Sequence, residues 1–257
     1  MNIYIITQDE PFYLPAMFER ILNSLKHEVA GISVLSESKS KPTTLRKFYN
    51  FYGPRLFCVI LFKYAAFKVS DMLSGLLPVK NLHSVSRICK RYGVKVFGTE
   101  NINSREFISR LKEMQVDMVV SIASPQIFRK ELLNTPPRGC INVHGAPLPK
   151  YRGMMPSFWM LLNGEKKGAV TVHYINEEVD SGDIILQREY DIDQSMTHHE
   201  LLVKSKQLAA ELLLDVVENI KKGQVVRKIN DKRQATYYSF PGKEDLKLFF
   251  KRGGRLR

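Results

Sequence analysis

The chain has 257 residues, of which 44% are hydrophobic, and its 39 Lys and Arg against 26 Asp and Glu give a formal net charge of +13. This length and composition suit one large packed domain, or one domain with an appendage, and exclude a chain that is disordered throughout. The positive charge lies mainly in two segments: residues 221–257 have 12 basic and 3 acidic residues, and residues 38–70 have 7 basic and no acidic residues. The net charge is +9 for the first segment and +7 for the second, which leaves −3 for all other residues. The rest of the chain is therefore close to neutral.

The cysteine content and the apolar runs bear on the cellular compartment. Three cysteines at unrelated spacings predict neither a disulfide framework nor a zinc site, and no set of His, Cys, Asp and Glu has the spacing of metal ligands. Acids follow the first short apolar run directly, which predicts a first strand rather than a signal peptide. The most apolar stretch, residues 56–69, contains two lysines and is too short to cross a bilayer. We therefore expect a cytoplasmic protein with no metal and no transmembrane segment.

The first 125 residues predict half of a Rossmann-like, doubly wound α/β domain with a mainly parallel sheet. A β-branched strand, a helix with apolar residues at helical spacing and a second apolar strand form a unit expected to be parallel and right-handed. A second round of elements ends in a fully apolar strand, which is typical of the centre of a parallel sheet. The elements are a strand at 2–7, a helix after Pro15, a strand at 29–35, a helix at 82–92, a strand at 95–97, a helix that Asn103 or Ser104 caps, and a strand at 117–122.

Between the two rounds, residues 42–77 form a helical insertion that is much longer than an ordinary connection. Aromatic residues are interleaved with Arg and Lys along it, and Gly53-Pro54 is expected to break it into two helices. Three interpretations remain open. The insertion packs its aromatic residues on the body or on a second subunit, forms a lid or wall of the acceptor-substrate pocket, or presents a surface to anionic lipid or nucleic acid.

The second half predicts a strand pair at 170–175 and 184–188, a long helix at 198–221 and a strand-like tail segment at 224–229. The chain from 139 to 192 is otherwise rich in loop signals. We therefore expect a domain of residues 1–193 that contains the insertion, and a short C-terminal extension, residues 194–257, whose helix and basic tail pack on that domain.

Three polar residues near the strand pair suggest a catalytic site. Asn142 and His144 alternate in an extended run around Val143, so both face the same side of a strand end. Asp180 follows 36 residues after His144 in a polar turn that closes on a glycine. This set predicts transfer to an external nucleophile: Asn142 donates to a developing oxyanion, His144 donates to the same oxygen or relays a proton, and Asp180 orients His144 or a relay water. His173 is interpreted as a packed or surface residue.

The segments NVHGAPLPKYRG and VTVHYINEEVDSGDIILQ resemble the formyltetrahydrofolate-dependent formyltransferase family. This family includes methionyl-tRNA formyltransferase, glycinamide ribonucleotide transformylase and the aminosugar N-formyltransferases. Its pattern is an Asn-x-His strand end, a Leu-Pro-x-Tyr/Trp-Arg-Gly turn and a downstream Asp-x-Gly loop. The matching positions are Asn142, His144, Leu148-Pro149, Tyr151-Arg152-Gly153 and Asp180-Ser181-Gly182-Asp183. The resemblance is most specific over residues 94–192.

The resemblance implies an enzyme, a formyltransferase whose catalytic domain, residues 1–193, uses 10-formyltetrahydrofolate as formyl donor, a primary amine as acceptor and no metal. It assigns Asn142 and His144 to stabilising the tetrahedral oxyanion, and Asp180 to assisting proton removal. The implied contacts of the donor are Ile122, Ala123, Ser124, Ile127, Val179 and Asp183. The implied contacts of the acceptor are Pro147, Tyr151, Arg152 and Gly153.

The acceptor is less defined than the donor. The family usually has Ser-Leu-Leu-Pro after the catalytic His-x, whereas this chain has Ala146-Pro147-Leu148-Pro149, which loses a hydroxyl and stiffens the loop. Members that act on initiator tRNA usually carry a second β-barrel domain, and only about 60 residues follow Asp193 here. We therefore favour a small or nucleotide-linked amine such as an aminosugar.

Several alternatives stay open. Methionyl-tRNA is the alternative acceptor, because the basic tail suits phosphate contacts, and the same charge favours a phosphate-bearing acceptor in general. Water can also replace the amine, which would make the protein a hydrolase that releases formate. A non-catalytic folate- or nucleotide-binding protein of the same fold is the alternative from another class, and a homodimer is open as well.

Overall fold

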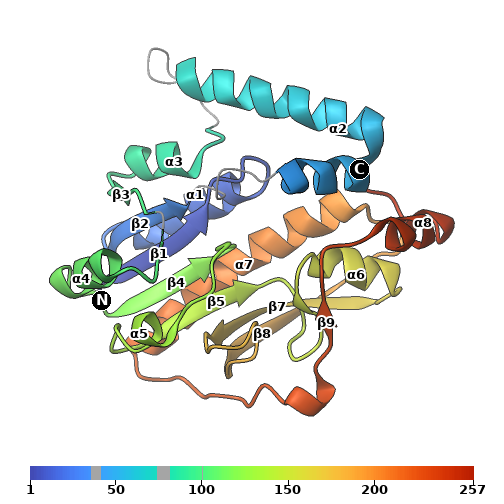
Figure 1. Ribbon diagram of the computed structural model, residues 1–257. Helices are drawn as coiled ribbons and strands as arrows, with labels where there is room; N and C mark the ends of the chain where they lie inside the picture. The colour runs from blue at the N-terminus through green and yellow to red at the C-terminus, as the bar shows by residue number, and fades with distance from the viewer. Residues whose placement is uncertain (36–41, 74–81, 100) are drawn as a thin grey trace.

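The computed structural model describes residues 1–35, 42–73, 82–99 and 101–257 (Figure 1). The strands are β1 (Ile3–Gln8), β2 (Val29–Leu35), β3 (Val96–Phe97), β4 (Met118–Ile122), β5 (Cys140–His144), β6 (Arg152–Gly153), β7 (Lys167–Tyr174), β8 (Ile184–Asp191) and β9 (Tyr237–Tyr238). The helices are α1 (Leu14–Leu25), α2 (Pro42–Leu73), α3 (Val85–Arg91), α4 (Arg105–Glu113), α5 (Lys130–Leu133), α6 (Pro156–Leu162), α7 (His198–Lys221) and α8 (Lys243–Lys251), with a 3₁₀ helix at Lys232–Gln234.

A seven-stranded sheet has the order β3-β2-β1-β4-β5-β7-β8. The first five strands in this order, β3, β2, β1, β4 and β5, pair in parallel. Strand β7 is antiparallel to both β5 and β8. The expectation of a Rossmann-like, mainly parallel sheet is confirmed. The long helix α7 also begins and ends where the sequence predicts, and Thr197 and Glu200 form a capping box at its start.

Helices cover both faces of this sheet because each central strand alternates its apolar side chains between two cores. Ile3 and Ile5 of β1 enter the core that α1, α3 and α7 cover. Tyr4 and Ile6 enter the core on the opposite face, where Phe107 of α4 lies edge-on against Tyr4. The side chains of β4 and β5, the strands that lead into the candidate site, divide between the same two cores.

The predicted break in the helical insertion is confirmed. Gly53 has a φ of +69°, which favours glycine, and Pro54 follows it. The part of α2 before the break packs on the body, where Phe51 is buried among aromatic side chains of α6 and the tail. The part after the break, residues 54–73, runs along one edge of the molecule, above α3 and α1 in Figure 1. Residues 74–77 of the predicted insertion lie outside the described residues.

The tail differs from its prediction. The prediction of a strand at 224–229 is wrong because the segment pairs with a strand only at Lys228, which forms an isolated bridge with Ile184, while Val226 and Ile229 are 82% and 78% exposed. Instead, β9 pairs in parallel with β6, and α8 packs against α6 and buries Leu246 and Phe249. The end of the chain is thus folded onto the region that carries the candidate site.

Candidate active site

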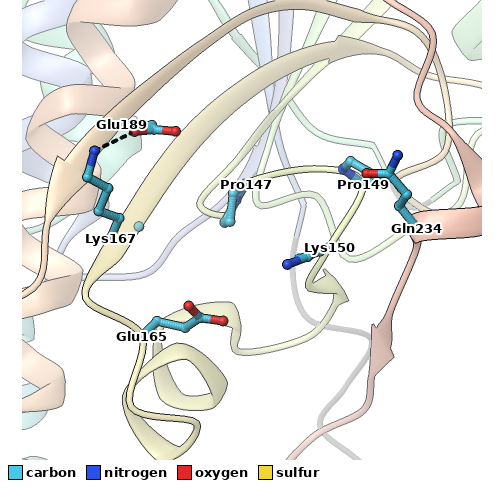
Figure 2. A pocket seen from close by; sticks show the side chains of 8 residues that line it. Pro147, Pro149, Lys150, Glu165, Lys167, Glu189 and Gln234 are labelled. Atoms are coloured by element: carbon cyan, nitrogen blue, oxygen red, sulfur yellow. Dashed lines mark hydrogen bonds and ion pairs between the residues drawn. The ribbon is translucent and has the colours of Figure 1, made fainter.

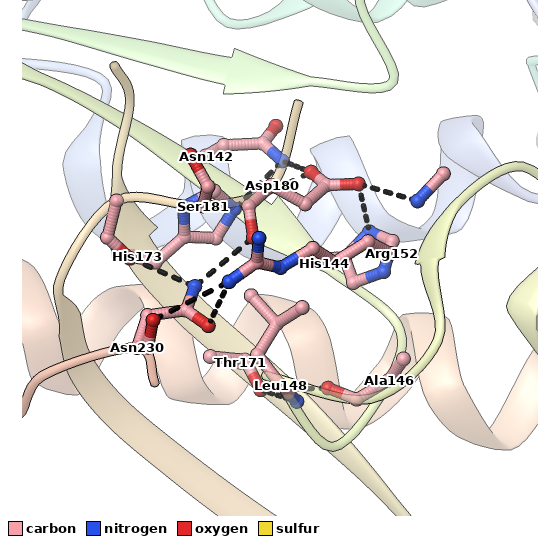
Figure 3. Close-up of polar contacts among 12 residues, drawn as sticks. Asn142, His144, Ala146, Leu148, Arg152, Thr171, His173, Asp180, Ser181 and Asn230 are labelled. Atoms are coloured by element: carbon pink, nitrogen blue, oxygen red, sulfur yellow. Dashed lines mark hydrogen bonds and ion pairs between the residues drawn. The ribbon is translucent and has the colours of Figure 1, made fainter. Parts of the chain in front are cut away.

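The three predicted catalytic residues meet at the carboxyl end of β5 (Figure 3). Asn142 and His144 lie on β5, which is parallel to β4, and Asp180 lies in the loop between β7 and β8. The carboxyl ends of parallel strands are where open α/β sheets bind their ligands. The pairing of β5 with β7 also places His173 opposite Asn142. Of the two alternatives for His173, a packed or a surface residue, the structure shows a buried side chain, and this side chain belongs to the same polar cluster.

The carboxylate of Asp180 is the centre of the cluster. Its Oδ2 accepts a hydrogen bond from the backbone N–H of Gly153 at 2.9 Å and lies 3.5 Å from Nδ1 of His144. Its Oδ1 accepts from Nδ2 of Asn142 at 3.3 Å and lies 3.5 Å from Nε2 of His173. Asp180 has a φ of +49°, which is uncommon for a residue with a side chain, and such backbone outliers are concentrated at functional sites.

The cluster holds Asp180 as an anion beside an uncharged His144. Burial raises the pKa of Asp180, but the positive charge that His144 carries when protonated, the contact with His173 and the N–H of Gly153 together hold that pKa well below its usual range. Burial lowers the pKa of His144, and this effect exceeds the opposing attraction of Asp180. At neutral pH the site therefore contains a carboxylate and a neutral imidazole.

The hydrogen bonds of the two histidines determine which ring nitrogen carries the proton. Nε2–H of His144 donates to the carbonyl of Tyr151 at 2.8 Å, so the neutral ring turns the lone pair of Nδ1 toward Asp180. Nδ1–H of His173 donates to the carbonyl of the following residue at 2.7 Å, so its Nε2 accepts from Nδ2 of Asn142 at 3.2 Å. Both contacts of the Asn142 amide are longer than the usual distance of about 2.9 to 3.0 Å. Catalytic hydrogen bonds are often long in the absence of substrate and tighten in the complex.

Gly153 and Tyr151 were predicted to bind the acceptor. In this structure both residues form hydrogen bonds with the catalytic cluster. Gly153 has a φ of +94°, and a Cβ there would lie 2.3 Å from the carbonyl of Tyr238, so only glycine allows its N–H to reach Asp180. Tyr151 has a φ of +60° and holds His144 through its carbonyl, while its hydroxyl donates to Glu165 at 2.6 Å. Contacts of these residues with an acceptor stay predictions.

Pro147, another predicted acceptor contact, lines a separate pocket of about 230 Å³ (Figure 2). The other lining residues are Pro149, Lys150, Glu165, Lys167, Gly168, Glu189 and Gln234. This pocket is smaller than the ligand pockets of about 300 to 1,000 Å³ that are usual in proteins. Asn142, His144 and Asp180 are not among its lining residues, so it is distinct from the catalytic cluster.

Asn230 is a residue of the site that the sequence reasoning missed. Its Oδ1 and backbone carbonyl accept from Nη2 of Arg152 at 2.7 and 3.3 Å. Its Nδ2 donates to the backbone carbonyls of Asp180 and Gly182, both at 3.0 Å. Arg152 and Asn230 are both buried, so Arg152, a predicted acceptor contact, here holds the loop of Asp180 through Asn230. Asn230 lies 50 residues after Asp180 in a segment without a motif, so no sequence signal points to it.

The residues predicted to contact the formyl donor lie at the end of β4 and on two loops next to the cluster. One loop directly follows β4 and contains Ala123, which has a φ of +53°, while the other carries Asp180 itself. The remaining predicted contacts are Ile122, Ser124, Ile127, Val179 and Asp183. Ile122 is buried, whereas Ile127 is 64% exposed and Val179 is 42% exposed, one on each loop. Exposed apolar side chains on these loops fit a flat heterocyclic ring.

A second pair of charged side chains, Glu10 and Lys206, is coupled electrostatically to His144 through Lys206. The carboxylate of Glu10 accepts from three backbone N–H groups at the start of α1, and Lys206 of α7 interacts electrostatically with both Glu10 and His144. Burial lowers the pKa of Lys206 and raises that of Glu10. The sequence contains a signal for Lys206: it lies at helical spacing between Leu202 and Ala209, on the side of α7 that is otherwise apolar.

Known sequences match a large part of the chain. The family described as Formyl transferase matches residues 64–217. The methionyl-tRNA formyltransferase of Ruminiclostridium cellulolyticum is 36% identical over 160 residues, which cover 62% of this chain and 51% of that protein. The methionyl-tRNA formyltransferase of Clostridioides difficile is 35% identical over 181 residues, which cover 70% of this chain and 57% of that protein. The chain thus spans about half the length of these curated relatives.

Solved structures share the fold at lower sequence identity. A sugar N-formyltransferase from Shewanella sp FDAARGOS_354 has a TM-score of 0.62 and 18% identity, covering 98% of this chain and 87% of that one. Glycinamide ribonucleotide transformylase 1 from Symbiobacterium toebii has a TM-score of 0.63 and 17% identity, and the match covers 90% of this chain and 95% of that one. WlaRD, a sugar 3N-formyl transferase in the presence of dTDP and 5-N-formyl-THF, has a TM-score of 0.61 and 16% identity, covering 93% and 69%. At these identities the similarity shows the fold alone.

Proposed function

The chain belongs to the formyl transferase family, and on this basis we propose that it transfers a formyl group from 10-formyltetrahydrofolate to a primary amine. The observation that carries the proposal is the contact of one carboxylate, that of Asp180, with both Asn142 and His144. An amide donor, an imidazole and a carboxylate around one point can polarise a carbonyl group and accept a proton. These are the two operations that formyl transfer to an external amine requires.

In the proposed reaction the amine attacks the formyl carbon that the donor supplies, and the formyl oxygen gains negative charge. Asn142 turns an N–H from Asp180 toward this oxygen. Nδ1 of the neutral His144 takes the proton that the amine loses, and the carboxylate of Asp180 balances the charge of the resulting imidazolium. The imidazolium then gives this proton to the nitrogen of the leaving tetrahydrofolate as the bond between that nitrogen and the formyl carbon breaks. The carbonyl of Tyr151 keeps the ring oriented through Nε2–H, so Nδ1 is the atom available to the proton.

The donor is proposed from the two loops beside the cluster. Ile127 and Val179 offer apolar surface to the faces of a pterin, and Ala123 has a positive φ that turns the backbone after β4. WlaRD, a structural neighbour, is described in the presence of 5-N-formyl-THF, which supports a formylated folate as the ligand of this fold.

For the acceptor we propose a small or nucleotide-linked amine such as an aminosugar. The supporting observation is the tail, which pairs with β6 and reaches the cluster through Asn230, so that it completes the site in the described part of the chain. Methionyl-tRNA is the second candidate. The relatives at 35% and 36% identity are methionyl-tRNA formyltransferases, and the 12 basic residues of 221–257 suit phosphate contacts.

The test is release of tetrahydrofolate from 10-formyltetrahydrofolate by the full chain, measured with a panel of amines. The panel contains nucleotide-linked aminosugars, glycinamide ribonucleotide, hydroxyornithine and methionyl-tRNA. We expect release that depends on an aminosugar and varies little with salt. Release that depends on methionyl-tRNA and falls steeply with salt would assign the second candidate. Release without any amine would indicate a hydrolase, and no release with any acceptor would contradict formyl transfer.

A further inference from the structure

The part of α2 after the break, residues 54–73, leaves its outer face uncovered at the edge of the molecule (Figure 1). Its exposed large apolar residues are Val59, Leu61, Phe62, Tyr64, Val69, Met72 and Leu73. Phe62 is 75% exposed and Met72 is 65% exposed. Single exposed apolar residues are ordinary, but a group on one element marks an interaction surface.

The spacing of these residues forms a continuous stripe. The stripe runs along Phe62, Ala65, Val69 and Met72 at intervals of three and four residues. The inward side of the same helix is defined by other contacts: the ring of Phe67 stacks on His83 at 3.8 Å, and the buried carboxylate of Asp71 accepts from the backbone N–H of His83 at 2.8 Å. The apolar stripe therefore faces away from the protein.

The charges beside the stripe are of one sign. Arg55 and Lys63 are exposed on this helix, whereas Lys68 pairs with Asp9 of the body at 3.4 Å. The one acidic residue of 54–73 is Asp71, which is buried on the inward side. Long basic side chains can lay their apolar stems along a lipid surface and extend their charged ends to anionic head groups. A second copy of the helix would bring the same positive charges, which repel. Phosphates of RNA would satisfy the charges but would leave the side chains of Val69 and Met72 without a partner.

We propose that the outer face of residues 54–73 binds the surface of a membrane that contains anionic lipids. In the described parts of the chain, no helix has the length and apolarity needed to span a bilayer. The binding mode is thus that of an interfacial helix, which lies in the plane of the head groups with its apolar stripe inserted. The part of α2 before the break connects this surface directly to the body, since Phe51 is buried there.

The experiment is flotation of the full chain with vesicles of phosphatidylcholine alone and of phosphatidylcholine mixed with phosphatidylglycerol. We expect binding to the mixed vesicles to be at least about tenfold tighter, because Arg55 and Lys63 can reach the anionic head groups. Phe62→Ser should weaken this binding about tenfold by removing an inserted aromatic side chain. Lys63→Gln should weaken binding to the mixed vesicles and leave binding to phosphatidylcholine unchanged.

Val226→Ser is the matched control, because Val226 is an equally exposed apolar residue outside this helix. It should bind both vesicles as the wild type does, and both serine variants should melt at the wild-type temperature. Equal binding of the wild type to the two vesicles, or wild-type binding by Phe62→Ser, would overturn the proposal. A dimer in lipid-free solution that Phe62→Ser dissociates, without vesicle binding, would assign the face to a second copy. Binding of tRNA that Phe62→Ser weakens, without vesicle binding, would assign it to RNA and equally overturn the proposal.

Discussion

Nη2 of Arg152 donates to Oδ1 of Asn230 at 2.7 Å, and through this buried pair the tail holds the loop that carries Asp180. Asn230→Asp keeps an acceptor for Arg152 but loses the two N–H donations to the loop. Asn230→Ala also removes the acceptor at 2.7 Å and leaves the buried guanidinium only the backbone carbonyl at 3.3 Å, which costs roughly 1 to 3 kcal/mol in the free energy of unfolding.

We expect Asn230→Asp to lose less stability in urea unfolding than Asn230→Ala, yet to lower the rate of formyl transfer about tenfold or more because Asp180 is no longer positioned. Equal losses of stability in the two variants would contradict the pairing of Arg152 with this side chain. A wild-type transfer rate in Asn230→Asp would contradict the positioning role.

Gly182 lies in the loop between β7 and β8, where the backbone of β7 comes so close that there is no room for a side chain. A Cβ at this position would lie 1.9 Å from the carbonyl oxygen of Tyr174, so Gly182→Ala must displace the loop of Asp180. We expect a loss of roughly 2 kcal/mol or more in the free energy of unfolding, measured by urea titration. Gly98→Ala is the control, because its Cβ meets nothing within 4 Å. It should stay within about 1 kcal/mol of the wild type, and a similar result for Gly182→Ala would show that the loop has room.

His198 makes the stability of the protein sensitive to acid. It is buried beside Phe51 and Phe158, its Nε2 has no hydrogen-bond partner among the described residues, and burial lowers its pKa to about 4. An unfolded histidine has a pKa of about 6.5. As the pH falls from about 6.5 to about 4, the unfolded chain gains this proton first, so stability falls by roughly 3 kcal/mol. His198→Phe should show a smaller loss in urea unfolding between pH 7 and pH 4.5, and an identical loss would exclude His198 as the cause.

Lys206 contributes to the low pKa of His144, because the positive charge of Lys206 disfavours a positive charge on the imidazole ring. Lys206→Met should therefore raise that pKa and shift the acid limb of the kcat/KM profile to higher pH, since the proposed reaction needs a neutral His144. Lys204→Met is the control on the same helix, where the ammonium donates to the backbone carbonyl of Asp191. Acid limbs that coincide in the wild type and Lys206→Met would contradict this electrostatic coupling.

Local signals in the sequence were sufficient for much of the fold. The apolar period of α7 gave its bounds, and Gly53-Pro54 marked the break in α2, because both depend on interactions within one segment. The strand expected at 224–229 is absent because its apolar residues find no neighbouring strand to pair with along their length, apart from the bridge at Lys228. Pairing partners are a tertiary property that composition does not carry.

In the candidate site, too, residues within local motifs could be predicted from the sequence, whereas residues brought in by the tertiary fold could not. Asn142, His144 and Asp180 were identifiable because their motifs are continuous in sequence, and the structure brings them together. Asn230 and His173 were not assigned to the site, since their contacts depend on how the tail folds back and on the register of β5 with β7.

Joint action of His144 and Asp180 on formyl transfer is tested most directly by a single-turnover assay. The assay compares the wild type, Asp180→Asn and Glu178→Gln with 10-formyltetrahydrofolate and the best acceptor of the panel. Glu178 is an exposed carboxylate in the same loop that pairs with Lys232, so it controls for loss of charge. We predict a rate at least about 100-fold lower for Asp180→Asn, with native circular dichroism, and a wild-type rate for Glu178→Gln. A wild-type rate for a folded Asp180→Asn variant would contradict the proposed mechanism.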